Sequence, residues 1–478
     1  MFQKSGYNFE MLYFELEDVV GRGNVSTRGS DKMSYSVDNF FVPRMWVEKG
    51  QKPESADFIV HVETAKQISD IMKIANYYRI PVIAWGGGSG SQGGSLPIYG
   101  GIIIDTKKMN KIIEINEQSY TATAEAGIIQ RHFEWEVNKQ DRSLMHIPAS
   151  IGCATLGGYI AHRGTGVLST KYGKIEDLIV NMEVVLPNGD IIDTLSVPRN
   201  AAGPDLNQLF CGSEGVYGII TKATVKMFDM PEERRFRAFM FHSMHDAYEA
   251  GRKLMTKGLQ PSVIRMYDEY ETQKMIKRVL GLDKDGAYLV FGFDGFKDVV
   301  DILERKAIEI CNETAYEDLG AEMGKEWWDN KYHFFFPPYC LDNPKMYGTM
   351  DTVASYDKLE AVYWAMKKVV ETEFENVHFM AHFSHWYEWG AMMYDRFFID
   401  PEHVPADPHE AMMLHNSIWN AAVRAAMKHG GIINEHHGVG LKLGRLMKEQ
   451  YGPAFQVLQG IKKQVDPNNI MNPGKMGL

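Results

Sequence analysis

The sequence predicts an α+β protein with two domains. Its length of 478 residues exceeds the usual size of one domain. Residues 50–230 consist mainly of short strand patterns, with few helices, whereas strand and helix patterns alternate over residues 231–430. Such alternation is typical of an antiparallel sheet that carries helices on one face. We therefore expect domains at residues 1–230 and 231–430, followed by a separate C-terminal segment at residues 431–478.

The first domain begins with a strand–helix–strand pattern and continues as a series of strands. Apolar residues at a spacing of 3.6 predict the first helix, and Pro187-Asn188-Gly189-Asp190 is a hairpin signal between the last two strands. Helices are expected at residues 65–78 and 129–138, and strands at 58–64, 80–87, 101–106, 111–116, 120–127, 177–186 and 191–194.

The elements of the second domain are predicted from the same kinds of sequence pattern, and they include more helices. Strands are expected at residues 236–242, 262–266, 287–293, 377–385 and 392–399. Helices are expected at residues 245–256, 271–279, 298–310, 358–370 and 409–428. The chain ends in DPNNIMNPGKMG, where proline and glycine prevent a further helix.

Composition excludes several classes of protein. Hydrophobic residues make up 45% and charged residues 24%, which is an ordinary globular balance. The 51 basic and 62 acidic residues give a net charge of −11, which disfavours nucleic acid as a partner. The four cysteines form no CxxC pair and read as reduced thiols. We find no signal peptide and no apolar run long enough for a transmembrane segment, so we expect a cytoplasmic protein.

The glycine run at residues 86–94 contains GxGxxG, but it is not a Rossmann loop. Pro97 and a strand follow it, so no helix is present to bind a pyrophosphate at its N-terminus. Closely spaced glycines can still curl backbone N–H groups around phosphate oxygens as a nest. A plain glycine-rich turn is the alternative.

Several ordered motifs identify a family. In order and spacing, they resemble the PCMH-type FAD-binding domain of the vanillyl-alcohol oxidase superfamily over residues 50–230 and again in the tail. Within that superfamily NAAGPDLNQLFCGSEG, PSVIRMYD, GAMMY and HHGVG are similar to alkyldihydroxyacetonephosphate synthase, whereas VDPNNIMNPGKMG is similar to the D-lactate and glycolate dehydrogenases. The motifs of the FAD-binding domain are PVIAWGGGSGSQGG, PASIGCATLGGYIA, YGKIEDLIVNMEVVLPNGDI and GSEGVYGIITKATVKM.

The resemblance implies a fold of two subdomains around FAD, a ferredoxin-like cap over the substrate, and a tail that returns to the active site. Because the 86–94 loop has no His or Cys, we expect the FAD to be noncovalent, although His162 and Cys153 lie in or near the other loops. The implied cofactor-binding residues are Trp85, Gly86, Gly87, Gly88, Ser89, Gly90, Pro148, Ser150, Thr155, Gly158, Arg163, Thr165, Glu214, Gly215, Gly218, Ile220 and Asn472.

The histidine pair His436-His437 is the first candidate for catalysis. In extended backbone, adjacent side chains point in opposite directions, so we expect only one of the two to face the flavin. Both related families place a His directly before such a glycine, which favours His437 in the chemistry and His436 in support. The alternative is a pair of structural histidines.

Tyr394 and Arg396 share one face of a predicted strand, where they could orient and polarise a substrate oxygen. The synthases have their key Tyr at the position of Tyr394, and an active-site Arg at that of Arg265. A fixed guanidinium suits a carboxylate or phosphate. The alternatives are an Arg396 that snorkels at the sheet rim and a surface ion pair of Arg265 with Asp268 or Glu269.

We expect no metal. His382 and His385 are separated by an odd number of positions on a strand, so they should not bind one ion together. The related metal-dependent dehydrogenases carry a Glu-His-Gly tail, and here His436 occupies the place of that Glu. The aromatic residues Trp327, Trp328, Tyr332, Phe334, Phe335, Phe336 and Tyr339 are typical of either an apolar substrate pocket or a plain cap core.

We therefore expect an FAD-dependent oxidoreductase, a homodimer, that passes a hydride from a small hydroxy acid, alcohol or phenol to the flavin. Here Tyr394 or His437 takes the proton, and Arg265 and Arg396 orient the substrate. The first alternative is an ether-forming enzyme similar to alkylglycerone-phosphate synthase. The second is a flavin subunit that passes electrons to a partner, an electron-transfer flavoprotein.

Overall fold

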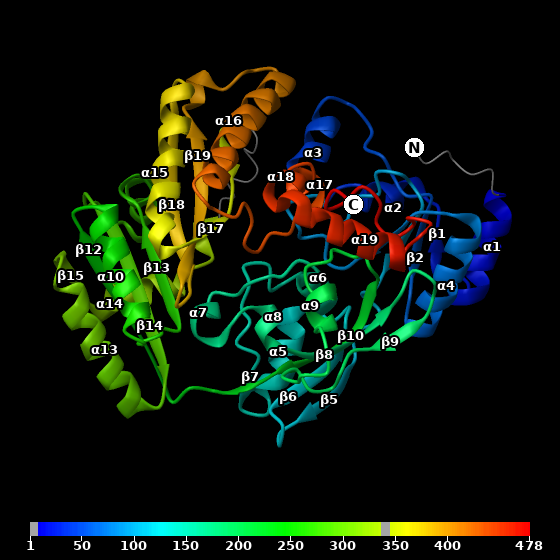
Figure 1. Ribbon diagram of the computed structural model, residues 1–478, viewed down its shortest axis with the longest axis horizontal. Coiled ribbons are helices and arrows are strands. Elements are labelled where there is room, and N and C mark those ends of the chain that lie inside the picture. Colours follow the sequence, from blue (N-terminus) through cyan, green and yellow to red (C-terminus); the bar gives the residue numbers. More distant parts are fainter. Residues whose placement is uncertain (1–7, 336–344) are drawn as a thin grey trace. The chain divides into compact units, whose positions relative to one another are not determined.

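The computed structural model describes residues 8–335 and 345–478, which form two compact units (Figure 1). The first unit contains the described residues up to Thr165, together with Lys174–Asp229 and His436–Leu478. The second contains Gly166–Gly173 and the described residues from Met230 to Glu435. Within the described part of the chain, no helix combines the length and apolarity that crossing a membrane requires.

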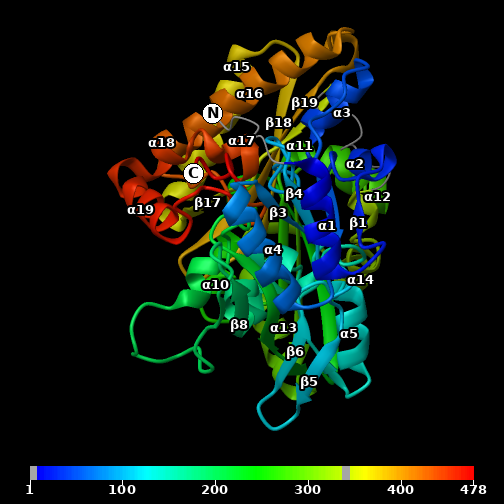
Figure 2. The same ribbon diagram turned by 90° about the vertical axis from the view of Figure 1, so that its right-hand side faces the viewer.

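A four-stranded sheet opens the first unit. Its strand order is β1-β2-β4-β3, and β2, β4 and β3 run parallel. The helix α4 connects β2 to β3 and buries its apolar face against the sheet core, so the predicted strand–helix–strand pattern is confirmed. The helix α1 packs against α4 (Figure 2) and has no counterpart among the predicted elements. The elements are α1 (Phe9–Val20), β1 (Val25–Ser26), α2 (Gly29–Ser34), α3 (Phe41–Glu48), β2 (Phe58–His61), α4 (Ala65–Tyr78), β3 (Val82–Trp85) and β4 (Ile102–Asp105).

A five-stranded antiparallel sheet, ordered β5-β6-β10-β8-β9, forms the rest of this unit. The predicted hairpin is confirmed: the amide of Leu186 donates to the carbonyl of Asp190 at 2.8 Å, and Gly189 takes φ +89° in the turn. The elements are β5 (Ile112–Asn116), β6 (Thr121–Glu125), α5 (Gln130–Asn138), α6 (Leu156–Ala161), α8 (Ile175–Leu178), β8 (Ile179–Val185), β9 (Ile191–Asp193), α9 (Leu206–Phe210) and β10 (Ile219–Lys226), with the small pair β7 (Arg142–Ser143) and β11 (Phe228–Asp229).

The C-terminal segment belongs to the first unit. Residues 470–472 lie along the outer edge of β3, where the amide of Val82 donates to the carbonyl of Ile470 at 2.7 Å. The amide of Asn472 then donates back to the carbonyl of Val82 at 2.8 Å. This pairing brings the last residues of the chain beside the strand that leads into the glycine run. The helices of the segment are α17 (Gly440–Gly444), α18 (Met447–Tyr451) and α19 (Phe455–Val465).

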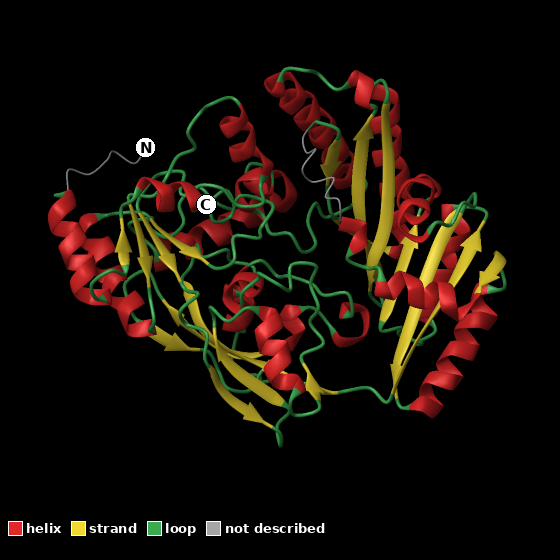
Figure 3. Ribbon diagram, turned by 180° about the vertical axis from the view of Figure 1, so that it is seen from behind, coloured by secondary structure: helices red, strands yellow, loops and turns green. Residues whose placement is uncertain are grey.

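The second unit is built on an antiparallel sheet, whose strands are yellow in Figure 3. Its order is β15-β12-β14-β13-β18-β19-β16, with β17 also paired to β19. The long strands β18 and β19 form a hairpin in which His382 lies opposite Tyr394. The strands are β12 (Glu233–Phe241), β13 (Val263–Tyr267), β14 (Ala287–Gly295), β15 (Ala315–Leu319), β16 (Tyr347–Thr349), β17 (Thr352–Ser355), β18 (Val377–Trp386) and β19 (Gly390–Ile399).

Helices of the second unit pack on this sheet and on one another. The helix predicted at residues 271–279 is a composite: a π-helical turn, Thr272–Ile276, separates two short α-helices. The short helix α7 (Ser169–Tyr172) belongs to this unit because Lys171 and Tyr172 both bind Asp294 at 2.8 Å. The other helices are α10 (Met244–Thr256), α11 (Glu269–Glu271), α12 (Lys277–Leu280), α13 (Lys297–Cys311), α14 (Gly320–Asp329), α15 (Tyr356–Glu373) and α16 (Pro408–Lys428).

Candidate active site

The glycine run connects β3 to β4 without a helix. Gly88 adopts φ +63°, a left-handed conformation that favours glycine. The amides of Gly87, Gly88, Ser89, Gly90 and Ser91 donate to no acceptor within the described residues. Backbone N–H groups that are gathered in one loop and left without protein acceptors form an anion-binding nest.

A second loop, residues 148–155, packs directly on the first. A Cβ added at Gly87 would lie 2.0 Å from the carbonyl oxygen of Cys153, and one added at Gly86 would lie 2.2 Å from Oγ1 of Thr155. Both positions therefore require glycine for this close approach. The Oγ1 atom of Thr155 is buried and has no hydrogen-bond partner in the described structure. Unpaired amides and a buried, unpaired hydroxyl beside them fit the diphosphate of a dinucleotide such as FAD.

All of the residues predicted to bind the cofactor lie in the first unit. Asn472 joins two of their loops, since its Nδ2 donates to the carbonyls of Gly94 at 2.8 Å and Glu214 at 2.7 Å. Three more of these residues are held by neighbouring parts of the unit. Nη2 of Arg163 donates to Oε1 of Gln208 at 2.6 Å. Ile220 packs in the sheet core, and Gly218 lies against β8. Trp85 ends β3, and Gly158 lies in α6. Pro148, Ser150, Thr165 and Gly215 lie in loops of the same unit.

A group of buried ionisable side chains lies behind the glycine run. Glu214, Asp38 and Lys475 are each at most 7% exposed. Burial raises the pKa of Asp38 to about 6 and lowers that of Lys475 to about 8. Lys475 donates to the carbonyl of Leu96 at 2.7 Å. Glu214 was among the predicted cofactor-binding residues, whereas sequence reasoning missed Asp38 and Lys475, and the NPGK motif did not indicate a buried lysine.

The rings of His436 and His437 lie against each other, with centroids 4.0 Å apart. The expectation that they point in opposite directions is therefore wrong. It assumed extended backbone, whereas this segment bends and the next residue, Gly438, takes φ +80°. The carbonyl oxygen of His437 lies 3.3 Å from Nδ1 of His162.

In the second unit, Glu271 is the centre of a buried polar cluster. Its Oε1 atom binds both Nη1 of Arg396, at 2.9 Å, and Nδ1 of His382, at 2.8 Å. Glu271 is 0% exposed and Arg396 is 3% exposed. Burial raises the pKa of Glu271 to about 7, and Arg396 and Arg265 oppose that rise. Glu271 was not among the predicted site residues because it lies three residues beyond the PSVIRMYD motif, in a segment that the motif does not cover.

Three of the predicted catalytic residues meet at this cluster. The guanidinium carbon of Arg396 lies 4.8 Å from the ring centre of Tyr394, and that ring stacks on His382 at 5.0 Å. On β13, Nη1 of Arg265 binds the hydroxyl of Ser384. Arg265 forms no ion pair with Asp268 or Glu269, whose carboxylates bind backbone amides of Glu271 and Met244. Arg396 lies on the strand interior rather than at a rim.

The cluster contains two buried guanidinium groups. Burial lowers the pKa of Arg265 and the nearby Arg396 lowers it further, whereas Glu271 and Glu435 raise it. The Nε atoms of both arginines are buried without a hydrogen-bond partner in the described structure. Glu435 itself binds His385 at 3.0 Å and the hydroxyl of Tyr387. Buried guanidinium donors without a partner favour an added anion.

His382 and His385 bind different carboxylates, Glu271 and Glu435.

The aromatic residues near position 330 pack inside the second unit. Nε1 of Trp327 donates to the hydroxyl of Tyr267 at 3.0 Å, and Phe334 stacks on the ring of Tyr267. Trp328 stacks on Phe236. The expected residues Phe336 and Tyr339 lie outside the described part of the chain.

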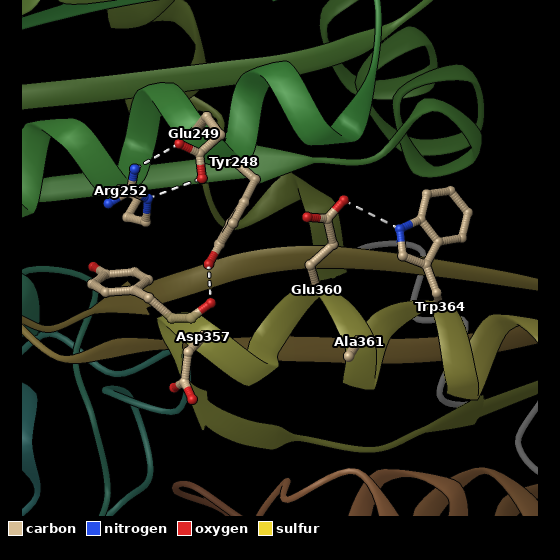
Figure 4. Close-up of a pocket in the computed structure, with 8 residues that line it drawn as sticks. Tyr248, Glu249, Arg252, Asp357, Glu360, Ala361 and Trp364 are labelled. Atoms are coloured by element: carbon tan, nitrogen blue, oxygen red, sulfur yellow. Dashed lines mark hydrogen bonds and ion pairs between the residues drawn. The ribbon is translucent and has the colours of Figure 1, made fainter.

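A surface hollow lies between α10 and α15 (Figure 4). Its polar side chains bind one another: Glu249 forms two hydrogen bonds with Arg252, and Oη of Tyr248 donates to the carbonyl of Tyr356 at 2.7 Å. None of the predicted site residues lines it.

Comparisons with known proteins match two family models to this chain. The FAD binding domain family matches residues 56–195, and the C-terminal domain family of FAD linked oxidases matches residues 230–476. Alkyldihydroxyacetonephosphate synthase of Dictyostelium discoideum is 29% identical over 73% of this chain, a match that spans 62% of that enzyme. A mitochondrial D-lactate dehydrogenase [cytochrome] of Arabidopsis thaliana is 28% identical over 88% of this chain and 73% of its own length. A solved structure of alkyldihydroxyacetonephosphate synthase superposes with a TM-score of 0.80 and 25% identity, over 99% of this chain and 87% of the other.

Proposed function

Because this chain belongs to the FAD-linked oxidase family of vanillyl-alcohol oxidase-type flavoproteins, we propose that it is an FAD-dependent dehydrogenase of a small 2-hydroxy acid. The observation that carries the proposal is the Glu271 cluster. There the guanidinium groups of Arg265 and Arg396 are buried, and the Nε atom of each has no hydrogen-bond partner in the described structure. A substrate carboxylate could bind these two groups. A neutral alcohol or phenol offers no such anion, so the two guanidinium groups favour a hydroxy acid.

The roles of the side chains follow from this arrangement. Arg265 and Arg396 hold the substrate carboxylate, and Glu271 with His382 fixes the direction of the Arg396 guanidinium. Tyr394 or His437 accepts the proton of the substrate hydroxyl as the C–H bond breaks. When bound, the flavin supplies the acceptor for the hydride. The first unit holds the FAD and the second unit holds the substrate.

We propose that the FAD is noncovalent. The amide nest of residues 87–91 binds the diphosphate. The 86–94 loop contains no His or Cys that could form a covalent bond to the flavin. His162 borders this loop, because a Cβ added at Gly90 would lie 2.6 Å from its Cε1 atom. Acid precipitation of the purified protein tests this point. Yellow supernatant and a colourless pellet support noncovalent FAD, whereas flavin that stays with the chain at His162 contradicts it.

The substrate proposal is tested by mixing purified holoprotein anaerobically with D-lactate, L-lactate or glycolate while the flavin absorbance is followed. Propane-1,2-diol, which replaces the carboxylate of lactate by an uncharged hydroxymethyl group, is the matched control. We expect one of the hydroxy acids to bleach the flavin and the diol to have no effect. Equal bleaching by the diol would contradict the role of the arginine pair.

A second candidate is an ether-forming enzyme similar to alkyldihydroxyacetonephosphate synthase, which the first relative and the solved structure favour. In that case the arginine pair would bind a phosphate instead of a carboxylate. The flavin would then stay oxidised with every hydroxy acid. The protein would instead exchange the acyl group of an acylated dihydroxyacetone phosphate for a long-chain alcohol.

The third candidate concerns the electron acceptor. The Arabidopsis relative is described as a cytochrome-linked dehydrogenase. If this chain passes electrons to a partner such as an electron-transfer flavoprotein, a hydroxy acid should reduce it quickly while turnover with oxygen or small dyes stays negligible. Rapid reoxidation by oxygen would favour an oxidase instead.

A further inference from the structure

The carboxylate of Glu214 holds the backbone that directly follows the histidine pair. Its Oε2 atom accepts the amide of Gly440 at 2.7 Å, and its Oε1 atom accepts the amide of Val439. Glu214 is only 5% exposed. Both oxygens of one buried carboxylate are thus committed to two consecutive amides of the loop that contains His436 and His437.

The loop is shaped to reach this carboxylate. Gly438 takes φ +80°, and a Cβ added there would lie 2.6 Å from Oε1 of Glu214 and 3.1 Å from Nδ1 of His162. His162 in turn lies 3.3 Å from the carbonyl oxygen of His437. The peptide after His437 is therefore held on both sides, by Glu214 through amides and by His162 through the carbonyl.

Glu214 occupies a backbone conformation that a glycine would adopt more easily. Its φ is +48°, in the left-handed region. Its carbonyl accepts Nδ2 of Asn472, the same amide group that holds Gly94 at the end of the glycine run. Residues that their neighbours hold in a strained backbone conformation cluster at functional sites.

The charges around Glu214 are consistent with a carboxylate that accepts two N–H groups. Burial raises its pKa, whereas His162, the two amides and Lys475 lower it. Asp38 is also close to these charges, because its carboxylate raises the pKa of Lys475. Only the ionised form offers both oxygens as acceptors.

We propose that Glu214 is a positioning residue that sets the orientation of the His436–His437 pair, rather than a residue that binds the cofactor. The proposal rests on the proposed role of His437 in proton transfer. Its first readout, the reactivity of the two histidines, does not depend on knowing the substrate.

The test compares Glu214→Gln with Glu183→Gln in the FAD-loaded protein. A glutamine at 214 keeps the size but turns an NH₂ group toward an amide N–H, so one of the two hydrogen bonds is lost. Glu183 is a matched control because its carboxylate also binds two partners, Thr221 and Lys222, in the same unit. Diethylpyrocarbonate labels neutral histidines, and mass spectrometry resolves each one.

We expect Glu214→Gln to keep its FAD and to raise the labelling rate of His436 and His437 severalfold, while the other histidines and the Glu183→Gln variant are unchanged. The rate of flavin reduction by a hydroxy acid should fall by about 100-fold without a change in the substrate dissociation constant, because a misplaced proton acceptor affects only the chemical step. If no hydroxy acid reduces the wild type, the proposed function fails, and the labelling result still decides the role of Glu214.

Gly438→Ala is the second variant, because its Cβ would press on the same carboxylate. It should show the same rise in labelling, and it replaces Glu214→Gln if that variant does not fold. Unchanged labelling of His436 and His437 in a folded, FAD-loaded variant overturns the proposal. Loss of FAD with unchanged labelling would return Glu214 to the cofactor-binding residues.

Discussion

Arg396 and Glu271 form an ion pair of 2.9 Å in which the side chains are 4% and 0% exposed. Burying two charges costs solvation free energy that their attraction repays only when the remaining hydrogen-bonding groups are also satisfied. Here the Nε atom of Arg396 and the Oε2 atom of Glu271 are buried with no partner in the described structure. This pair is therefore a poor source of stability.

Removal of Arg396 should destabilise the fold. Arg396→Met removes the guanidinium that binds the buried Glu271 carboxylate, and we expect the free energy of unfolding to fall by about 3 kcal/mol at neutral pH. The double variant Arg396→Met with Glu271→Gln should recover much of this loss, because the buried carboxylate charge is then absent. Urea unfolding of the wild type and the two variants measures both effects. A single variant as stable as the wild type would show that the pair does not bear charge in the folded state.

Stability should depend on pH through Asp38. Burial raises the pKa of Asp38 in the folded state to about 6. Between the pKa of the unfolded chain and pH 6, the Asp38 carboxyl is therefore protonated in the folded state and ionised in the unfolded state. The stabilisation from Asp38 is complete below its unfolded pKa and is lost as pH rises through 6, by about 3 kcal/mol in all. Asp38→Asn should remove this slope. Urea unfolding from pH 4 to 6.5 tests this, and parallel curves for the two proteins would contradict it.

Tyr394→Phe should slow the chemical step and leave FAD binding unchanged, because Tyr394 lies in the second unit and the amide nest lies in the first. If Tyr394 takes the hydroxyl proton, flavin reduction should slow by about 100-fold or more at saturating hydroxy acid. Stopped-flow measurement of flavin bleaching provides the rate. An unchanged rate would assign the proton to His437, for which His437→Ala is the companion variant.

Gly87→Ala should yield a protein without FAD. Its Cβ would lie 2.0 Å from the carbonyl oxygen of Cys153, so the loop would have to move away from its neighbour and lose the arrangement of its amides. Gly460→Ala is the matched control, since no atom lies within 4 Å of its added Cβ. The ratio of flavin absorbance to protein concentration measures the outcome. A yellow Gly87→Ala protein would show that the nest does not hold the cofactor.

Local patterns in the sequence sufficed for the elements around the cofactor loops. The spacing of apolar residues in α4 and the Asn188-Gly189 turn depend on neighbouring residues alone, so both could be predicted. Glu271 could not, because its partners Arg396 and His382 come from distant strands that only the folded sheet brings together. The orientation of His436 and His437 was predicted wrongly for a related reason. It depends on a bend at Gly438, where Glu214 and His162 fix the backbone.

The most direct test of the account is anaerobic flavin reduction by a 2-hydroxy acid that carries deuterium at C2. The account predicts that the flavin is bleached and that deuterium slows the bleaching, because the C2–H bond breaks as the hydride leaves. Equal rates with the two isotopes would contradict hydride transfer as the observed step. A flavin that stays oxidised with every hydroxy acid would contradict the proposed function as a whole.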